Sequence, residues 1–190
     1  AGAALSLQDE INRAVLTCPA SYGIRQRRAI ALAGELAGLH VERVLSAPLA
    51  VVFAQLKRGR LAAGRYLVYD LGASVFDVAV VQVQAQSARL LAAGGDPELA
   101  GVEFDHALAE DVFGQLEALH GQQTLSQFAL QDVVDLCEVA KCELSTQTSP
   151  RSGVEQKPVG DAPAFATEIE VHREAAEQRF EPLVDRTLQI

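Results

Sequence analysis

Strand-like alternation of apolar and polar residues dominates the last third of the first half of the chain. Such stretches cover residues 65–70, 75–84 and 87–93, with a turn near Gln84 to Ser87, so the pattern predicts an antiparallel meander of three strands. Shorter apolar runs predict further strands at 14–18, 41–45 and 166–171.

Helical spacing of apolar residues separates and follows these strands. It predicts helices at 23–39, 48–58, 101–119, 126–145 and 174–190. Gly38 is a C-cap signal for the first helix, and Pro48 fits the first turn of the second. Residues 146–164 contain three prolines and two glycines without an apolar period, which predicts a flexible loop. The order of elements indicates an α/β protein with a mostly helical second half.

Composition narrows the function classes. The 190 residues are 49% apolar and 22% charged, which is typical of a globular protein with a real core. A net charge of −9 argues against nucleic acid as a partner. No apolar run approaches the ~20 residues of a membrane span, and residues 1–6 lack the basic and apolar regions of a secretory signal, so we expect no membrane partner.

Cysteine and histidine spacing does not indicate a metal or covalent site. Cys137 and Cys142 lie five apart on a predicted helix, where their side chains diverge, so free buried thiols are expected. The histidines show no ligand spacing, and Ser21 and Ser46 have no neighbouring His/Asp pair, so zinc binding and nucleophilic catalysis are not predicted. These histidines are His40, His106, His120 and His172.

The most informative segment is residues 66–81, in which two apolar strands flank a turn of small residues. Asp70 ends the first strand and Asp77 lies seven positions later. A carboxylate at a strand end can reach a metal-bound phosphate, although capping of a turn is an equally ordinary role. Gly72 permits positive φ and close backbone approach, so that amide groups in the turn can face an anion.

This D-L-G-x-x-x-F-D string resembles the second phosphate-binding motif of the Hsp70 chaperone ATPases. Four more stretches resemble the same family in order: residues 15–39, 44–50, 94–105 and 137–145. The chain therefore resembles a divergent internal fragment of the Hsp70 (DnaK-type) nucleotide-binding domain, in the actin-like ATPase superfamily.

The resemblance implies a partial actin-like ATPase (ribonuclease H-like) fold: a β-meander with flanking helices plus a mostly helical outer subdomain. Residues 1–62 would end the first ATPase lobe, and 63–98 would form the core of the second. Residues 99–180 would form the outer subdomain of the second lobe, and 181–190 would start a returning helix. The family's first phosphate hairpin and last glycine loop would lie before residue 1 and after residue 190.

The same resemblance implies a site for ATP or ADP with Mg²⁺, with binding expected to be weak or lost in the isolated chain. Asp70 would hold the metal through water and, with Asp77, act in catalysis. Pro19 matches a proline with an allosteric role. The implied nucleotide-binding residues are Gly72, Ala73, Ser74, Gly101, Glu138, Lys141 and Ser145. The last three lie at i, i+3 and i+7, on one helical face, where a plain surface ion pair is the alternative interpretation.

Departures from the family pattern concern hydrolysis. Ala73 and Ser74 replace glycines, which predicts crowding and strain in the phosphate turn. Val75 and Leu49 replace threonines, and Ala47 replaces a glutamate that orients metal-bound water. Losing one charge-positioning group can slow catalysis ~100-fold, so hydrolysis is expected to be impaired.

Two functions follow from the resemblance. One is a segment of a molecular chaperone ATPase that binds ATP or ADP and assists protein folding. The alternative is a pseudo-ATPase acting as a structural or interaction subunit of a larger assembly; an actin-like sugar kinase fits less well. Expected partners are the remainder of the ATPase domain or partner chains, co-chaperones and nucleotide exchange factors. The expected location is the cytoplasm or an organelle lumen.

Overall fold

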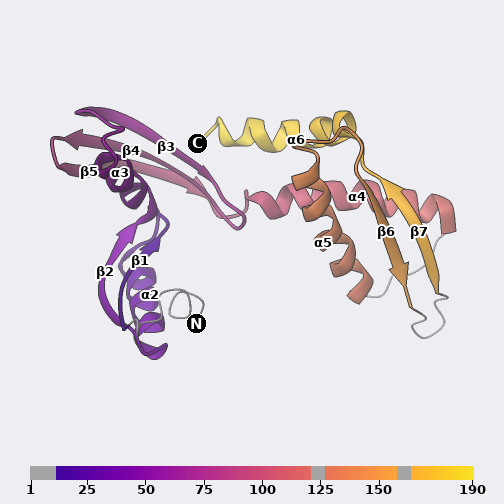
Figure 1. The fold of residues 1–190 in the computed structure, drawn as a ribbon, viewed down its shortest axis with the longest axis horizontal. Coiled ribbons are helices and arrows are strands. Elements are labelled where there is room, and N and C mark those ends of the chain that lie inside the picture. Colours follow the sequence, from indigo (N-terminus) through magenta and orange to yellow (C-terminus); the bar gives the residue numbers. More distant parts are fainter. Residues whose placement is uncertain (1–11, 121–126, 158–163) are drawn as a thin grey trace. The chain divides into compact units, whose positions relative to one another are not determined.

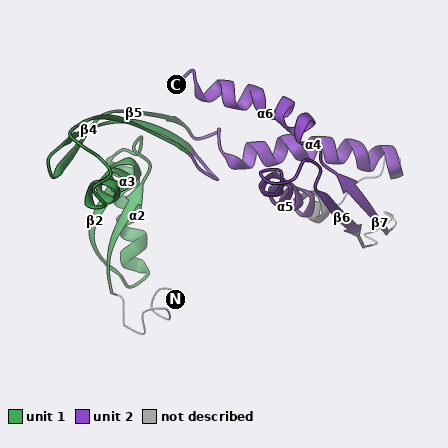
Figure 2. Ribbon diagram, turned by 45° about the horizontal axis from the view of Figure 1, so that its top comes forward, with its two compact units in different colours: residues 1–70, 76–96 green, residues 71–75, 97–190 purple. Residues whose placement is uncertain are grey.

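A computed structural model describes residues 12–120, 127–157 and 164–190 of the protein. The chain divides into two compact units (Figure 2). Unit 1 consists of residues 1–70 and 76–96, and unit 2 consists of residues 71–75 and 97–190. A short turn at 71–75 thus belongs to unit 2, although the strands on both sides of it lie in unit 1.

Unit 1 begins with a strand–helix–strand segment (Figure 1). Strand β1 (Arg13–Cys18) pairs in parallel with β2 (His40–Ser46), and helix α2 (Ile24–Leu36) connects them. Beyond the end of α2, Gly38 has φ +83° and its N–H donates to Glu35, while the Leu39 N–H donates to Gly34. This pair of bonds is a Schellman motif, so the C-cap predicted at Gly38 is confirmed.

The predicted meander is also confirmed. Strands β3 (Gly64–Leu71), β4 (Phe76–Gln84) and β5 (Ser87–Asp96) form a sheet in that order, and β4 and β5 are antiparallel. Helix α3 (Ala47–Lys57) packs on this sheet around a buried cluster of Val52, Val81 and Val83. The prediction was short at one end, because residues 94–96 continue β5 by pairing with the start of β4.

The described residues of unit 2 form three helices and a two-stranded sheet, which Figure 1 labels. Its elements are α4 (Gly101–His120), α5 (Gln127–Glu143), β6 (Arg151–Gln156), β7 (Phe165–Glu170) and α6 (Arg173–Thr187). The predicted apolar stripe on α4 is buried, as expected from its four-residue spacing. The predicted start of the next helix at Ser126 lies outside the described residues.

The flexible loop predicted at 146–164 is wrong for residues 151–156. These residues form β6, which pairs antiparallel with β7 along its whole length. Pro150 lies just before the strand, where no ladder N–H is needed, and its carbonyl accepts the Val171 N–H at 3.1 Å. Pairing with the next strand along the chain therefore outweighs a local composition that is typical of loops.

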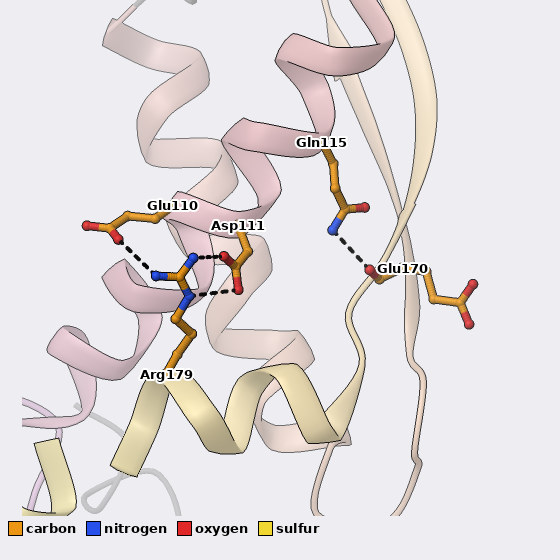
Figure 3. Close-up of polar contacts among 5 residues, drawn as sticks. All are labelled: Glu110, Asp111, Gln115, Glu170 and Arg179. Carbon is orange, nitrogen blue, oxygen red and sulfur yellow. Dashed lines mark hydrogen bonds and ion pairs between the residues drawn. The ribbon is translucent and has the colours of Figure 1, made fainter. Parts of the chain in front are cut away.

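Polar contacts join the elements of unit 2 (Figure 3). From α6, Arg179 makes a two-point contact with Asp111 of α4, with Nη2–Oδ1 at 2.5 Å and Nε–Oδ2 at 3.3 Å. The hydrogen bonds and charge of Asp111 raise the pKa of Arg179. Gln115 of α4 donates to the Glu170 carbonyl of β7 at 3.2 Å. These contacts hold α6 and β7 against α4.

Among the residues that the structure describes, none of the helices is both long and apolar enough to span a membrane.

Candidate functional site

The turn at residues 72–75 is bonded to the start of α4. The Gly72 N–H donates to the Val75 carbonyl at 3.0 Å, which closes the turn. The Gly101 N–H donates to the Gly72 carbonyl at 2.8 Å, and the Val102 N–H donates to the Ala73 carbonyl at 3.1 Å. A Cβ on Gly101 would lie 3.3 Å from the Ala73 Cα, so a residue without a side chain allows this close approach.

The same turn leaves two amide groups for an anion. Ala73 and Ser74 are exposed, and in the described part of the chain their N–H groups have no backbone acceptor. Two adjacent free amides can donate to phosphate oxygens, so the residues present fit this group. The expected strain is wrong, because positive φ occurs among the described residues only at Gly38, Gly59 and Ala85. Replacement of the family's glycines therefore leaves the turn unstrained.

Three predicted adenosine-side residues lie on or just after α5. Glu138 and Ser145 are exposed, whereas the side chain of Lys141 is only 24% exposed. The Lys141 Nζ lies 2.7 Å from Asp105 Oδ1 and donates to the Gly101 carbonyl at 3.1 Å. The structure thus brings the lysine to the residue that holds the turn at 72–75. A surface ion pair with Glu138, the alternative interpretation, is not what Lys141 forms.

Sequence reasoning missed Asp105. This carboxylate is buried, at 5% exposure, and faces Lys141 across the α4–α5 contact. One signal was available: Asp105 lies four residues after Gly101 on a predicted helix, and that spacing places both on one face.

In unit 1, the structure brings Asp77 together with the turn that follows β1. Asp77 is 3% exposed, and its Oδ2 accepts the Ala20 N–H at 2.8 Å, while the Ser21 hydroxyl lies 3.4 Å from Oδ1. The turn itself is closed by the Tyr22 N–H, which donates to the Pro19 carbonyl at 3.2 Å. Asp77 therefore supports the Pro19 turn through both of its oxygens.

Asp70 lies on β3 near its end and is exposed, as its predicted position implies. Within the described ranges, no group of three or more His, Cys, Asp or Glu side chains could hold a metal ion. Mg²⁺ keeps several of its waters and uses few carboxylates when it is bound with a phosphate group. A single exposed carboxylate is compatible with the water-mediated contact expected of Asp70.

The positions that depart from the family pattern have local structural roles. Ala47 opens α3, and Leu49 packs against the buried cluster of unit 1. The Val75 carbonyl closes the turn at 72–75. Each replacement therefore fits the local structure and supplies no hydroxyl or carboxylate for hydrolysis.

The three thiols are free, as expected, but only two of them are buried. Cys18 and Cys137 lie in the interior, whereas Cys142 is exposed, so the expectation of burial is wrong at that position. Burial raises the pKa of Cys18. Burial, followed by the charges of Asp105 and Asp111, raises the pKa of Cys137 to about 12. The two interior thiols are therefore protonated and unreactive near neutral pH.

A separate open pocket of about 440 Å³ lies between α4, the end of β7 and the start of α6. Gly114, Ala118, Ala175 and Ala176 are among the small residues that line it. None of the site residues predicted from the sequence lines this pocket.

Comparison with known proteins identifies the class to which this arrangement belongs. The sequence model of the family described as Hsp70 protein matches residues 2–190. The chain is 33% identical to the chaperone protein DnaK of Halobacterium salinarum over 184 residues, which is 96% of this chain and 29% of that protein. It is 37% identical to the chaperone protein HscA homolog of Burkholderia lata, over 96% of this chain and 28% of that protein. With the heat shock protein hsp-6 of Caenorhabditis elegans it shares 31% identity, over 94% of this chain and 27% of that protein.

The chain belongs to the Hsp70 family. It spans less than a third of the length of these curated relatives. Its mixed helices and sheets are part of the actin-like ATPase fold, so the predicted fold class is confirmed. The family is one of nucleotide-binding ATPase domains.

Proposed function

We propose that this chain is a nucleotide-recognising segment of a chaperone ATPase domain that assists protein folding, with impaired hydrolysis. The observation that carries the proposal is the connection from the turn at 72–75 through Gly101 to Lys141. Gly101 of α4 thereby holds both the turn whose free amides would bind a phosphate and the lysine that would bind a ribose hydroxyl.

Each site residue has a proposed role. The amides of Ala73 and Ser74, in the turn opened by Gly72, bind phosphate oxygens. Glu138 and Ser145 contact the adenosine with Lys141. Asp70 holds Mg²⁺ through water, where the ion would neutralise phosphate charge. Asp77 holds the turn that contains Pro19, the proposed allosteric residue. The hydrogen bond from the Ala20 N–H to the Asp77 carboxylate supports this role of Asp77.

Impaired hydrolysis is proposed from what the site lacks. Phosphoryl transfer needs an oriented water and donors near the γ-phosphate. Ala47 offers no carboxylate for that water, and Val75 offers no hydroxyl. Binding needs fewer groups than hydrolysis, so we expect ADP recognition to survive better than ATP turnover.

A pseudo-ATPase that serves as a structural or interaction subunit is the second candidate. One observation favours it: the Lys141 ammonium is already engaged by Asp105 and by the Gly101 carbonyl. In that role the chain would work through the remainder of the ATPase domain or partner chains. Co-chaperones and nucleotide exchange factors are proposed partners in either case.

The proposed lobe assignment accompanies both functions. Residues 1–62 would end the first ATPase lobe, 63–98 form the core of the second, 99–180 its outer subdomain, and 181–190 a returning helix. The cytoplasm or an organelle lumen is the proposed location.

Isothermal titration with Mg²⁺-ADP and Mg²⁺-ATP separates the two candidates. We expect ADP to bind with a Kd of roughly a millimolar, which corresponds to a binding free energy of about −4 kcal/mol. ATP should bind with the same affinity or more weakly. Lys141→Ala should weaken ADP binding about tenfold, and Lys57→Ala at the end of α3 should leave it unchanged. Absence of heat with millimolar ADP would reject nucleotide recognition and leave the pseudo-ATPase. Phosphate release that is abolished by Asp70→Asn would reject impaired hydrolysis.

A further inference from the structure

A buried carboxylate that the proposed nucleotide contacts do not use lies beside them. Asp105 is 5% exposed and its side chain lies in the α4–α5 contact of unit 2. A buried charge is strongly unfavourable unless it is paired and hydrogen-bonded. Its cationic partner is Lys141, whose Nζ lies 2.7 Å from Asp105 Oδ1, so each charge stabilises the other in this buried position.

The Lys141 ammonium has three N–H donors. One is donated to the Gly101 carbonyl at 3.1 Å, while Asp105 Oδ1 lies 2.7 Å from Nζ as an ion pair that lacks hydrogen-bond geometry. Both partners lie in the first turns of α4, so the hydrogen bond and the ion pair together hold the ammonium group in one place. The N–H donors that do not bond Gly101 remain for a ligand hydroxyl, on a group whose position is set before the ligand arrives.

The same lysine supports the turn at 72–75. It holds the Gly101 carbonyl, while the N–H of Gly101 holds the Gly72 carbonyl at 2.8 Å. The Val102 N–H, next along α4, holds the turn in the same way by donating to the Ala73 carbonyl. Asp105, Lys141, Gly101 and the turn are thus one continuous set of contacts within unit 2.

We propose that Asp105 is a positioning residue that aims Lys141 and, through Gly101, holds the turn at 72–75 in place. Its effect on nucleotide binding rests on the proposed function, whereas its effect on the turn does not. Removing the Asp105 charge releases a lysine side chain that is already one quarter exposed, and the Gly101 carbonyl then loses its hydrogen bond from Lys141 Nζ. The turn then loses support on the side that presents the free amides of Ala73 and Ser74.

Amide hydrogen exchange of the ligand-free protein tests the effect on the turn. Asp105→Asn should accelerate exchange at Gly101 and Val102 by at least about tenfold, because a charge-assisted contact behind them is lost. Lys141→Ala removes the contact from the other side and should do the same, which covers the case in which Asp105→Asn does not fold. The matched control is Asp111→Asn, an equal change on the same helix, and it should leave both amides unaffected. Equal exchange rates in the wild type and in Lys141→Ala would overturn the proposal.

A double-mutant cycle on ADP affinity, followed by titration calorimetry, tests the effect on Lys141. Asp105→Asn should weaken ADP binding about fivefold, and adding it to Lys141→Ala should cause no further loss. Asp105→Glu, which keeps the charge, should recover part of the affinity. Additive losses would mean that Asp105 acts independently of Lys141 and would overturn the positioning role. If the wild type binds no ADP, the proposed function fails, and hydrogen exchange alone decides whether Asp105 and Lys141 hold the turn.

Discussion

Asp77→Ala is the sharpest test of how unit 1 is held together. Asp77 lies on β4, and its Oδ2 accepts the N–H of Ala20 at 2.8 Å from a residue 57 positions earlier in the chain. The wild-type carboxylate is 3% exposed and Ala20 is 9% exposed, so water does not replace the lost acceptor readily. The substitution should therefore loosen the turn at Pro19 from the sheet.

The expected loss follows from these two facts. A hydrogen bond to a charged group contributes about 1.5–3 kcal/mol, and leaving a buried N–H without a partner costs about 1–3 kcal/mol. The two values describe the same lost interaction, so they are not added. The Ser21 hydroxyl at 3.4 Å is near the limit for a hydrogen bond and adds little. We expect Asp77→Ala to lower the free energy of unfolding of unit 1 by about 2–3 kcal/mol. Asp77→Asn keeps one oxygen acceptor and should lose about half as much.

Urea unfolding followed by tyrosine fluorescence measures this loss. The three tyrosines of the chain, Tyr22, Tyr66 and Tyr69, all lie in unit 1, and the chain has no tryptophan. With a slope of about 1–2 kcal/mol per molar urea, the midpoint for Asp77→Ala should fall by roughly 1–3 M. The matched control is Asp70→Ala, an exposed aspartate, which should change stability by less than about 0.5 kcal/mol. Equal midpoints for the two variants would refute the structural role of Asp77.

Two further predictions concern packing and protonation. A Cβ on Gly95 would lie 2.4 Å from the Phe76 carbonyl oxygen, so Gly95→Ala should destabilise the protein by about 1–3 kcal/mol. A Cβ on Gly153 would meet open space, so Gly153→Ala should stabilise the protein by up to ~1 kcal/mol. The thermal midpoints, measured by circular dichroism, should therefore shift in opposite directions. Burial and nearby carboxylates raise the pKa of Cys137 to about 12, above the roughly 8.5 of an unfolded thiol. The stability linked to this proton is complete below about pH 8.5 and is lost as the pH rises towards 12. In the wild type the free energy of unfolding should therefore fall between about pH 9 and 11, and Cys137→Ala should make this fall less steep. An unchanged slope in Cys137→Ala would contradict the raised pKa of Cys137. The same change of slope in the control Cys142→Ala would contradict it as well.

Local pattern predicted the elements where local and tertiary preferences agree. The four-residue apolar spacing of α4 identified a buried helix face, and alternation around the turn at 72–75 identified the meander. The pattern failed at β6, where prolines and glycines near residues 151–156 indicated a loop. That strand exists because β7 supplies its hydrogen-bonding partners, and pairing of this kind depends on neighbours more than on composition.

The sequence by itself determined the family and the order of the elements other than β6, because the motifs are short, local and ordered along the chain. Helical spacing also put Glu138, Lys141 and Ser145 on one face, whereas their role as nucleotide contacts was implied by the family resemblance and stays a prediction. Only the tertiary structure decided which charges pair: Lys141 with Asp105 and with the carbonyl of Gly101, 40 positions away, and Asp77 with the turn after β1. No local period relates residues so far apart. Their pairing arises when apolar faces pack and leave buried polar groups that must find partners inside the protein.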